Sequence, residues 1–212
     1  MILYGSSMSP FVRKVMVALA EKAIAYDLKP VGIGDPDPGF RAASPFGKMP
    51  ALVDGDYALA DSSAIVHYLD ALHPAPSLLP ADPRARGRAV WFDEFADTIL
   101  MAAIQPMFFN RVVAPLFLKR EGDMAAAAKA EAEAVPPVLD WLETQVGASG
   151  HLVGDTLTLA DIAVASPLVN FGHVGGVVDA ARRPKLAAWV AAMHARPAFA
   201  ATIAFERKIL KR

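Results

Sequence analysis

Residues 44–72, SPFGKMPALVDGDYALADSSAIVHYLDAL, decide the fold of the first part of the chain. A short apolar run lies on each side of the Asp-Gly-Asp sequence at 54–56, and this arrangement is typical of a tight antiparallel hairpin. Pro50 stands immediately before the first run, where it removes one ladder donor and therefore belongs to a sheet edge or a turn. Asp and two Ser residues at 61–63 then cap a helix that runs to about residue 72. The segment predicts a hairpin followed directly by a helix.

Upstream of this segment, short apolar runs at 2–4 and 26–31 enclose a helical stretch. Ser9 followed by Pro10 is a strong signal for the start of that helix, because serine caps free amides and proline at the first helical position loses no hydrogen bond. A parallel strand pair joined by a crossover helix and extended by the hairpin gives a mixed four-stranded sheet of the thioredoxin type.

Downstream, four prolines fall within ten residues in the stretch HPAPSLLPADP, which predicts a linker between two domains. Apolar residues at three- and four-residue spacing then predict helices over 84–107, 124–145, 161–169 and 185–195. The fold class is therefore α/β plus all-α. We expect a thioredoxin-like domain over 1–75, a linker over 76–86 and an all-helical domain over 87–212.

The composition excludes several classes of protein. The 212 residues include 21 basic and 22 acidic side chains, so there is no basic field for nucleic acid. No run of about 18 consecutive apolar residues and no secretory leader is evident, which predicts a cytoplasmic protein with no membrane partner. The absence of cysteine excludes a protein thiol as nucleophile or redox group. The five histidines are not spaced as metal ligands on one helix, so no metal is expected.

The loop Ser6-Ser7-Met8-Ser9 is the first candidate site. Ser9 is an ordinary helix cap on the simplest interpretation. A hydroxyl that accepts from helix amides still has its own proton to donate, and at the positive end of the helix dipole it favours an anion such as a thiolate. Both interpretations stay open from spacing alone.

Two further junctions are candidates. Pro50 is a trans proline at a strand start on the simplest interpretation, whereas a cis Met49–Pro50 bond would leave the Met49 main chain free to pair with an extended ligand. Asp61 and Ser62 are either an ordinary cap or a pair that binds an amino-acid head group, with the helix start taking the carboxylate and Asp61 the ammonium.

Taken together, these motifs resemble those of the soluble glutathione transferase superfamily, and the similarity covers essentially the whole chain. The stretches that carry it are LYGSSMSPFVRKVMVALAEK, SPFGKMPALVDGD, LADSSAIVHYLD and HLVGDTLTLADIAVA. The resemblance implies a transferase, active in detoxification, that uses glutathione as co-substrate and forms a homodimer. In the last stretch, Thr158 and Asp161 form a capping box, which we interpret as structural.

The resemblance also implies roles for individual residues. Ser9 matches the catalytic hydroxyl of serine-type members, with Ser6 and Ser7 as rivals. The glutathione-binding residues would be Lys48 at the glycyl carboxylate, Met49 and Pro50 at the cysteinyl part, and Asp61 and Ser62 at the γ-glutamyl end. Asp61 departs from the glutamate that is common in the family.

The electrophile is expected beside the thiolate, and its candidate contacts are Met8, Phe11, Phe108, Phe109 and Arg111. The leading hypothesis is conjugation of glutathione to a small apolar electrophile. One alternative is a glutathione-dependent isomerase or lyase, and an isomerase of maleyl acids would need pocket cations, for which Arg13 and Arg111 are the candidates. Another alternative is a non-catalytic binding module of the same superfamily.

Overall fold

The computed structural model describes residues 1–211 and divides the chain into two compact units. The first unit comprises Met1–Ala81 together with the described residues from Pro197 onward, and the second comprises Asp82–Arg196. The grouping of the C-terminal segment with the first unit differs from the expected domain limits, which remain a prediction.

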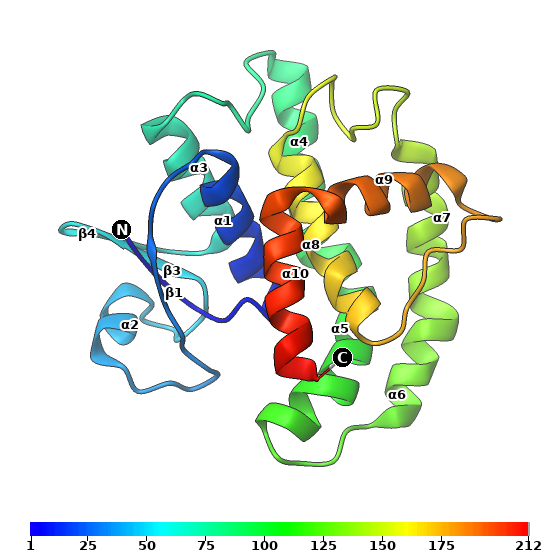
Figure 1. The fold of residues 1–212 in the computed structure, drawn as a ribbon, viewed down its shortest axis with the longest axis horizontal. Helices are drawn as coiled ribbons and strands as arrows, with labels where there is room; N and C mark the ends of the chain where they lie inside the picture. The colour runs from blue at the N-terminus through cyan, green and yellow to red at the C-terminus, as the bar shows by residue number, and fades with distance from the viewer. Residues whose placement is uncertain (212) are drawn as a thin grey trace. The chain divides into compact units, whose positions relative to one another are not determined.

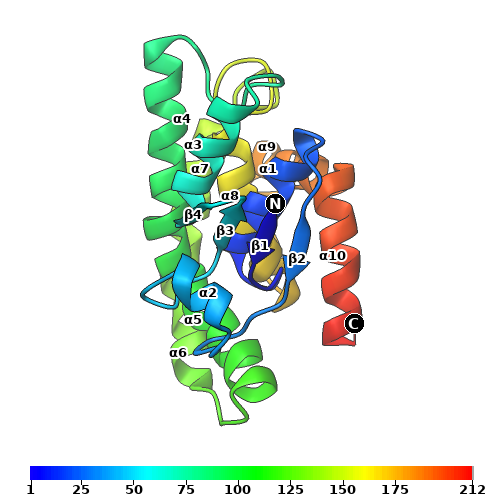
Figure 2. The ribbon, with the colours of Figure 1, turned by 90° about the vertical axis from the view of Figure 1, so that its left-hand side faces the viewer.

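The first unit is built on a mixed sheet of four strands, in the order β2-β1-β3-β4. The strands are β1 (Ile2–Tyr4), β2 (Asp27–Lys29), β3 (Ala51–Asp54) and β4 (Tyr57–Ala60). β1 pairs in parallel with β2, as Figure 2 shows, and antiparallel with β3, while β3 and β4 form the predicted hairpin. The predicted fold class is confirmed.

The first unit also contains four helices. They are α1 (Pro10–Glu21), α2 (Pro38–Ala43), α3 (Ser62–Leu72) and α10 (Pro197–Leu210). In Figure 1, α1 and α3 lie together on one side of the strands and α2 lies on the other. Helix α10, which was not among the predicted helices, packs against α1.

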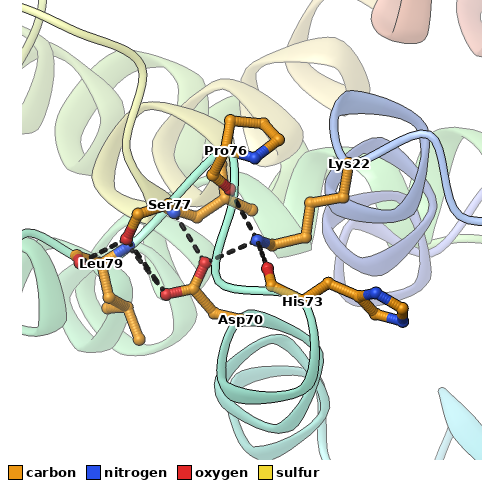
Figure 3. A network of polar contacts seen from close by, with 7 residues as sticks. Lys22, Asp70, His73, Pro76, Ser77 and Leu79 are labelled. Atoms are coloured by element: carbon orange, nitrogen blue, oxygen red, sulfur yellow. Dashed lines mark hydrogen bonds and ion pairs between the residues drawn. The ribbon is translucent and has the colours of Figure 1, made fainter.

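A network around Lys22 ties the end of α1 to the end of α3 (Figure 3). Lys22 Nζ donates to the carbonyl oxygens of His73 and Pro76, each at 2.6 Å, and forms an ion pair with Asp70 at 2.7 Å. The Asp70 carboxylate also accepts from the Leu78 amide at 2.7 Å. The first residues of the expected linker are thus hydrogen-bonded and packed in the first unit, since Leu78 is only 1% exposed.

The second unit is helical throughout its regular structure. Its elements are α4 (Pro83–Phe95), the π-helical turn η1 (Ala96–Leu100), α5 (Met101–Phe108), η2 (Phe109–Phe117), α6 (Met124–Lys129), η3 (Ala130–Ala134), α7 (Val135–Gln145), α8 (Leu159–His173) and α9 (Pro184–Ala195). Each of the four predicted helical stretches is helical, and two of them extend further than expected.

The stretch predicted over 84–107 extends farthest. It continues through Pro106 to residue 117, and its last part, residues 109–117, has π-helical geometry. The side chain of Asn110 donates to the Pro106 carbonyl at 2.9 Å. Judged only by its length and composition, the whole helix, Pro83–Phe117, could cross a membrane. Core helices of soluble proteins pass the same test.

Asp161 has the structural role predicted for it. The side chain is fully buried and accepts hydrogen bonds from the Thr158 amide at 3.0 Å, the Leu152 amide at 2.9 Å and the Trp189 indole at 3.2 Å. Burial raises the pKa of this carboxyl, and the hydrogen bonds and His151 oppose that rise. Asp161 therefore joins the start of α8 to a loop and to α9.

Candidate functional site

The register of the sheet brings the predicted site segments to one edge of the first unit. Tyr4, the last residue of β1, lies opposite Ala51, the first residue of β3, and Ala51 lies opposite Ala60, the last residue of β4. The loop that leads to Ser9, the Met49–Pro50 segment and the start of α3 all leave the sheet at this edge.

Ser9 begins α1 in the predicted manner. The backbone is extended at Ser9, Pro10 occupies the first helical turn, and the Ser9 hydroxyl oxygen accepts from the Val12 amide at 3.5 Å. That distance is beyond the usual 2.7–3.2 Å range of N–H···O bonds, so the cap interaction is weak. The loop before it is close to α1, since a Cβ at Gly5 would lie 2.5 Å from the Val12 side chain. The Ser9 hydroxyl is half-buried and keeps its own hydrogen to donate.

The Met49–Pro50 bond is cis, as the resemblance implied. Within residues 1–211, neither the amide nor the carbonyl of Met49 takes part in a hydrogen bond. The preceding loop is held by Ser44, whose hydroxyl donates to the Lys48 carbonyl at 2.7 Å and accepts from the Lys48 amide at 3.0 Å. The Lys48 side chain is exposed. A rigid loop thus presents an unpaired main-chain donor and acceptor beside the sheet.

Asp61 caps α3 from an unusual backbone conformation. Its φ is 83°, a region that residues with a Cβ rarely adopt, and its Oδ1 accepts from the amides of Ser63 at 2.9 Å and Ala64 at 3.0 Å. Left-handed conformations of this kind cost about 1–3 kcal/mol and concentrate at functional sites. Ser62 is 2% exposed, and its hydroxyl forms no hydrogen bond in the described part of the chain. The start of α3 therefore combines a carboxylate with an unengaged hydroxyl.

Sequence reasoning missed a connection between the two helix starts. Lys14, on the second turn of α1, is 1% exposed, and its Nζ donates to the Ser63 hydroxyl at 3.1 Å. The signal for it was a lysine on a helix whose buried residues are mostly apolar. Through this contact, the helix that begins at Ser9 is joined to the helix capped by Asp61.

The candidate electrophile contacts fall in both units. Met8 and Phe108 are each 6% exposed, whereas Phe11 is half-buried. Arg111 donates to Glu131 at 2.5 Å and to the Val174 carbonyl at 3.3 Å, all within the second unit. These assignments remain predictions.

Arg13, the other cation considered for an isomerase, is not available to a substrate. Its guanidinium donates twice to Glu206 on α10, from Nε at 3.0 Å and from Nη2 at 2.8 Å, and both side chains are fully buried. The interpretation of Arg13 as a pocket cation is therefore wrong. An arginine so close to the predicted helix start was misleading because its partner lies 193 positions away in the sequence.

A thioredoxin-like unit with a capped α1, a cis proline before β3 and an aspartate-capped α3, followed by a helical unit, is the arrangement expected of a glutathione transferase. Comparison with known proteins gives the same class. The family models described as the N-terminal and C-terminal domains of glutathione S-transferase match residues 3–77 and 125–192. Glutathione S-transferase 3 of Zea mays is 36% identical over 208 residues, covering 95% of this chain and 92% of the relative.

Solved structures agree with these matches. A glutathione S-transferase from Rhodospirillum rubrum superposes with a TM-score of 0.85 at 28% identity, covering 93% of this chain and 89% of that one. A structure described as glutathione S-transferase-I bound with lactoylglutathione gives 0.84 at 25% identity, covering 96% and 98% of the two chains. The chain belongs to the glutathione S-transferase family, and the predictions of its family and of a transferase are confirmed.

Proposed function

We propose that the protein binds reduced glutathione along the sheet edge and activates its thiol at Ser9 for attack on a small apolar electrophile. The observation that carries the proposal is the strand register, which brings the starts of α1, β3 and α3 to one edge of the sheet. Each of these starts carries protein groups that could bind the tripeptide. In this arrangement Met49 pairs with the cysteinyl main chain of the tripeptide. Asp61 and Ser62 hold the γ-glutamyl ammonium and carboxylate, and Lys48 meets the glycyl carboxylate.

The energetics of thiol activation fit these groups. A cysteine-like thiol has a pKa of about 8.5, and lowering it by about two units requires ~2.7 kcal/mol of preferential stabilisation of the anion. A hydrogen bond to a charged partner contributes ~1.5–3 kcal/mol, and a helix N-terminus adds ~0.3–1 kcal/mol. Ser9 with α1 therefore suffices, and the thiol proton leaves to solvent without a general base on the protein.

The experiment is calorimetric binding of reduced glutathione combined with conjugation of chlorodinitrobenzene. We expect Ser9→Ala to lower kcat with little change in glutathione affinity, since the hydroxyl acts mainly on the thiolate. Ser149→Ala, on an exposed loop of the second unit, is the matched control. Equal losses of kcat and affinity in Ser9→Ala would contradict the role of Ser9. If the wild type neither binds glutathione nor conjugates it to chlorodinitrobenzene, a non-catalytic module would be favoured.

An isomerase activity is the weaker alternative, because Arg13 and Arg111 are both engaged by glutamates. The same purified protein assayed with a maleyl acid tests it directly. The cytoplasmic location and the absence of metal, nucleic-acid and membrane partners stay predictions from composition.

We further propose that the active form is a homodimer. The second unit carries an apolar depression of about 350 Å³, lined by Trp91, Phe95, Ile99, Pro137, Val138 and Trp141. The first unit presents Phe46, which is 90% exposed, on the loop before Pro50. A ring of this kind from a second copy would fill the depression, because aromatic side chains bury large apolar areas at interfaces.

Sedimentation velocity tests the dimer. The wild type should sediment as a dimer, and Phe46→Ser should shift it toward the monomer. Ile33→Ser, which changes another strongly exposed apolar residue of the first unit, is the matched control. A monomeric wild type would refute the proposal, as would a Phe46→Ser variant that dimerises as well as the control.

A further inference from the structure

Helix α10 has an exposed side that carries large apolar residues. The helix packs against α1, and Glu206 binds Arg13 there. The buried residues of α10, which are spaced three or four apart, are Phe199, Thr202, Glu206 and Leu210. Phe205 and Ile209 lie outside this buried set and are 54% and 42% exposed. Because four residues make about one helical turn, these two side chains are neighbours on the helix surface.

The end of α10 also carries basic side chains. Arg207, Lys208 and Lys211 are exposed, and within residues 1–211 none of their side chains has a hydrogen bond or an ion pair. The one acidic residue of the helix, Glu206, is fully buried and bonded to Arg13, so it does not offset these charges at the surface. The formal charge of the whole chain is −1, so the composition conceals this local excess of positive charge.

Helical spacing brings the apolar and basic side chains together. Residues three and four apart are neighbours, so Lys208 and Ile209 both lie beside Phe205, and Lys211 lies beside Lys208. Ala201 is also exposed and continues the apolar stripe by one turn toward the start of the helix. The exposed side of α10 therefore combines an apolar stripe, over residues 201, 205 and 209, with adjacent lysines.

This combination is complementary to an anionic lipid surface. Helices that lie in a membrane interface place Phe, Leu or Trp in the headgroup boundary and use Lys and Arg to pair with acidic headgroups. A lysine side chain can contact apolar groups through its methylene chain while its ammonium group stays with the headgroups. A nucleic acid would engage the cations through its phosphates but would leave Phe205 and Ile209 without apolar contacts.

We propose that the exposed side of α10 is a docking surface for an anionic membrane, on which the protein rests without crossing the bilayer. Phe205 and Ile209 enter the headgroup boundary, and the three basic residues pair with acidic headgroups. Binding is reversible, because two apolar side chains and a few cations form only a modest anchor. The inference departs from the composition-based prediction of no membrane partner, since net charge and span length do not describe one side of one helix.

The test is cosedimentation of the full chain with lipid vesicles at low salt. The vesicles are phosphatidylcholine either alone or with about one third phosphatidylglycerol, which supplies the negative charge. We expect the wild type to bind the acidic vesicles at least about tenfold more strongly than the neutral ones. Raising the salt concentration should abolish this preference, because exposed charges are then screened.

Variants of α10 locate the binding surface. Lys208→Gln combined with Lys211→Gln should weaken binding to acidic vesicles about 10–30-fold. The matched control is Lys129→Gln combined with Lys185→Gln, which removes the same charge from exposed positions of the second unit and should bind like the wild type. Phe205→Ser should weaken binding about 3–10-fold, whereas Ile33→Ser, at another exposed apolar position, should not. The melting temperature of each variant should match that of the wild type, because the replaced side chains are exposed.

Three results would overturn the inference. A wild type that binds neither kind of vesicle excludes a lipid surface, and this is the result expected if α10 instead contacts an acidic protein. Equal binding to acidic and neutral vesicles excludes the proposed role of the cations. Equal effects of the α10 variants and their controls place the binding surface elsewhere. Glutathione binding is measured separately, so the proposed function and this inference can fail independently.

Discussion

Removal of Glu206 should destabilise the first unit strongly. Its carboxylate receives two hydrogen bonds from Arg13, and neither side chain is exposed to solvent. Glu206→Ala leaves the Arg13 charge buried without this partner. Breaking a buried ion pair from one side costs about 3–5 kcal/mol, because the remaining charge keeps its desolvation penalty. For chains of 150–250 residues each kcal/mol lowers Tm by about 2–4 °C, so a fall of roughly 6–20 °C is expected.

The assay is urea unfolding followed by far-ultraviolet circular dichroism, with Tm measured in parallel. Glu131→Ala is the matched control, since Glu131 pairs with Arg111 but is 44% exposed. An exposed pair contributes at most about 1 kcal/mol, because water and salt screen it. The double variant Arg13→Met with Glu206→Leu should recover most of the loss, since an apolar pair of similar volume needs no charge compensation.

Two results would refute this reasoning. One is a Glu206→Ala variant that is no less stable than Glu131→Ala, which would mean that the buried pair contributes no more than the exposed one. The other is a double variant as unstable as the single variant, because the damage would then come from lost packing rather than from an uncompensated charge.

The remaining predictions concern Lys14 and Asp161. Lys14→Met should raise KM for glutathione about 2–10-fold with less effect on kcat, because the bond from Lys14 to Ser63 supports the start of α3. Steady-state kinetics measure both constants, and Lys14→Arg should restore part of the loss. A fall in kcat with no change in KM would contradict this role of Lys14. Burial raises the pKa of Asp161 in the folded state, so its contribution to stability is largest below its unfolded pKa of about 4 and is lost as pH rises through the folded pKa. The advantage of the wild type over Asp161→Asn in free energy of unfolding should therefore shrink from about pH 4 to pH 7, and an advantage that grows over this range would contradict the stated shift.

Local signals were sufficient to predict the sheet and most helices. The turn at 54–56 and the cap at Asp61 act over a few residues, and the structure has the hairpin and α3 where they were predicted. The same holds for the capping box at Thr158, whose partners are also close in the chain. Where the energetics are local, a short stretch of sequence contains all of the interacting groups.

Long-range partners set the limit of sequence reasoning. Arg13 was interpretable as a pocket cation because nothing near it in the chain revealed Glu206, and α10 was missed together with that partner. The helix continues through Pro106 to residue 117 with a π-helical end, which the apolar spacing does not encode. These features are decided by tertiary contacts that residue spacing cannot report.

Polar groups that stabilise the fold differ from the proposed ligand-binding groups in whether they have hydrogen-bond partners inside the protein. Asp70 and Asp161 are buried among several donors, and removing either would cost the fold its internal hydrogen bonds. The Met49 main chain and the Ser62 and Ser7 hydroxyls have no such partners within residues 1–211. The Met49 main chain and the Ser62 hydroxyl lie where β3 and α3 begin, at the edge where the proposed ligand binds.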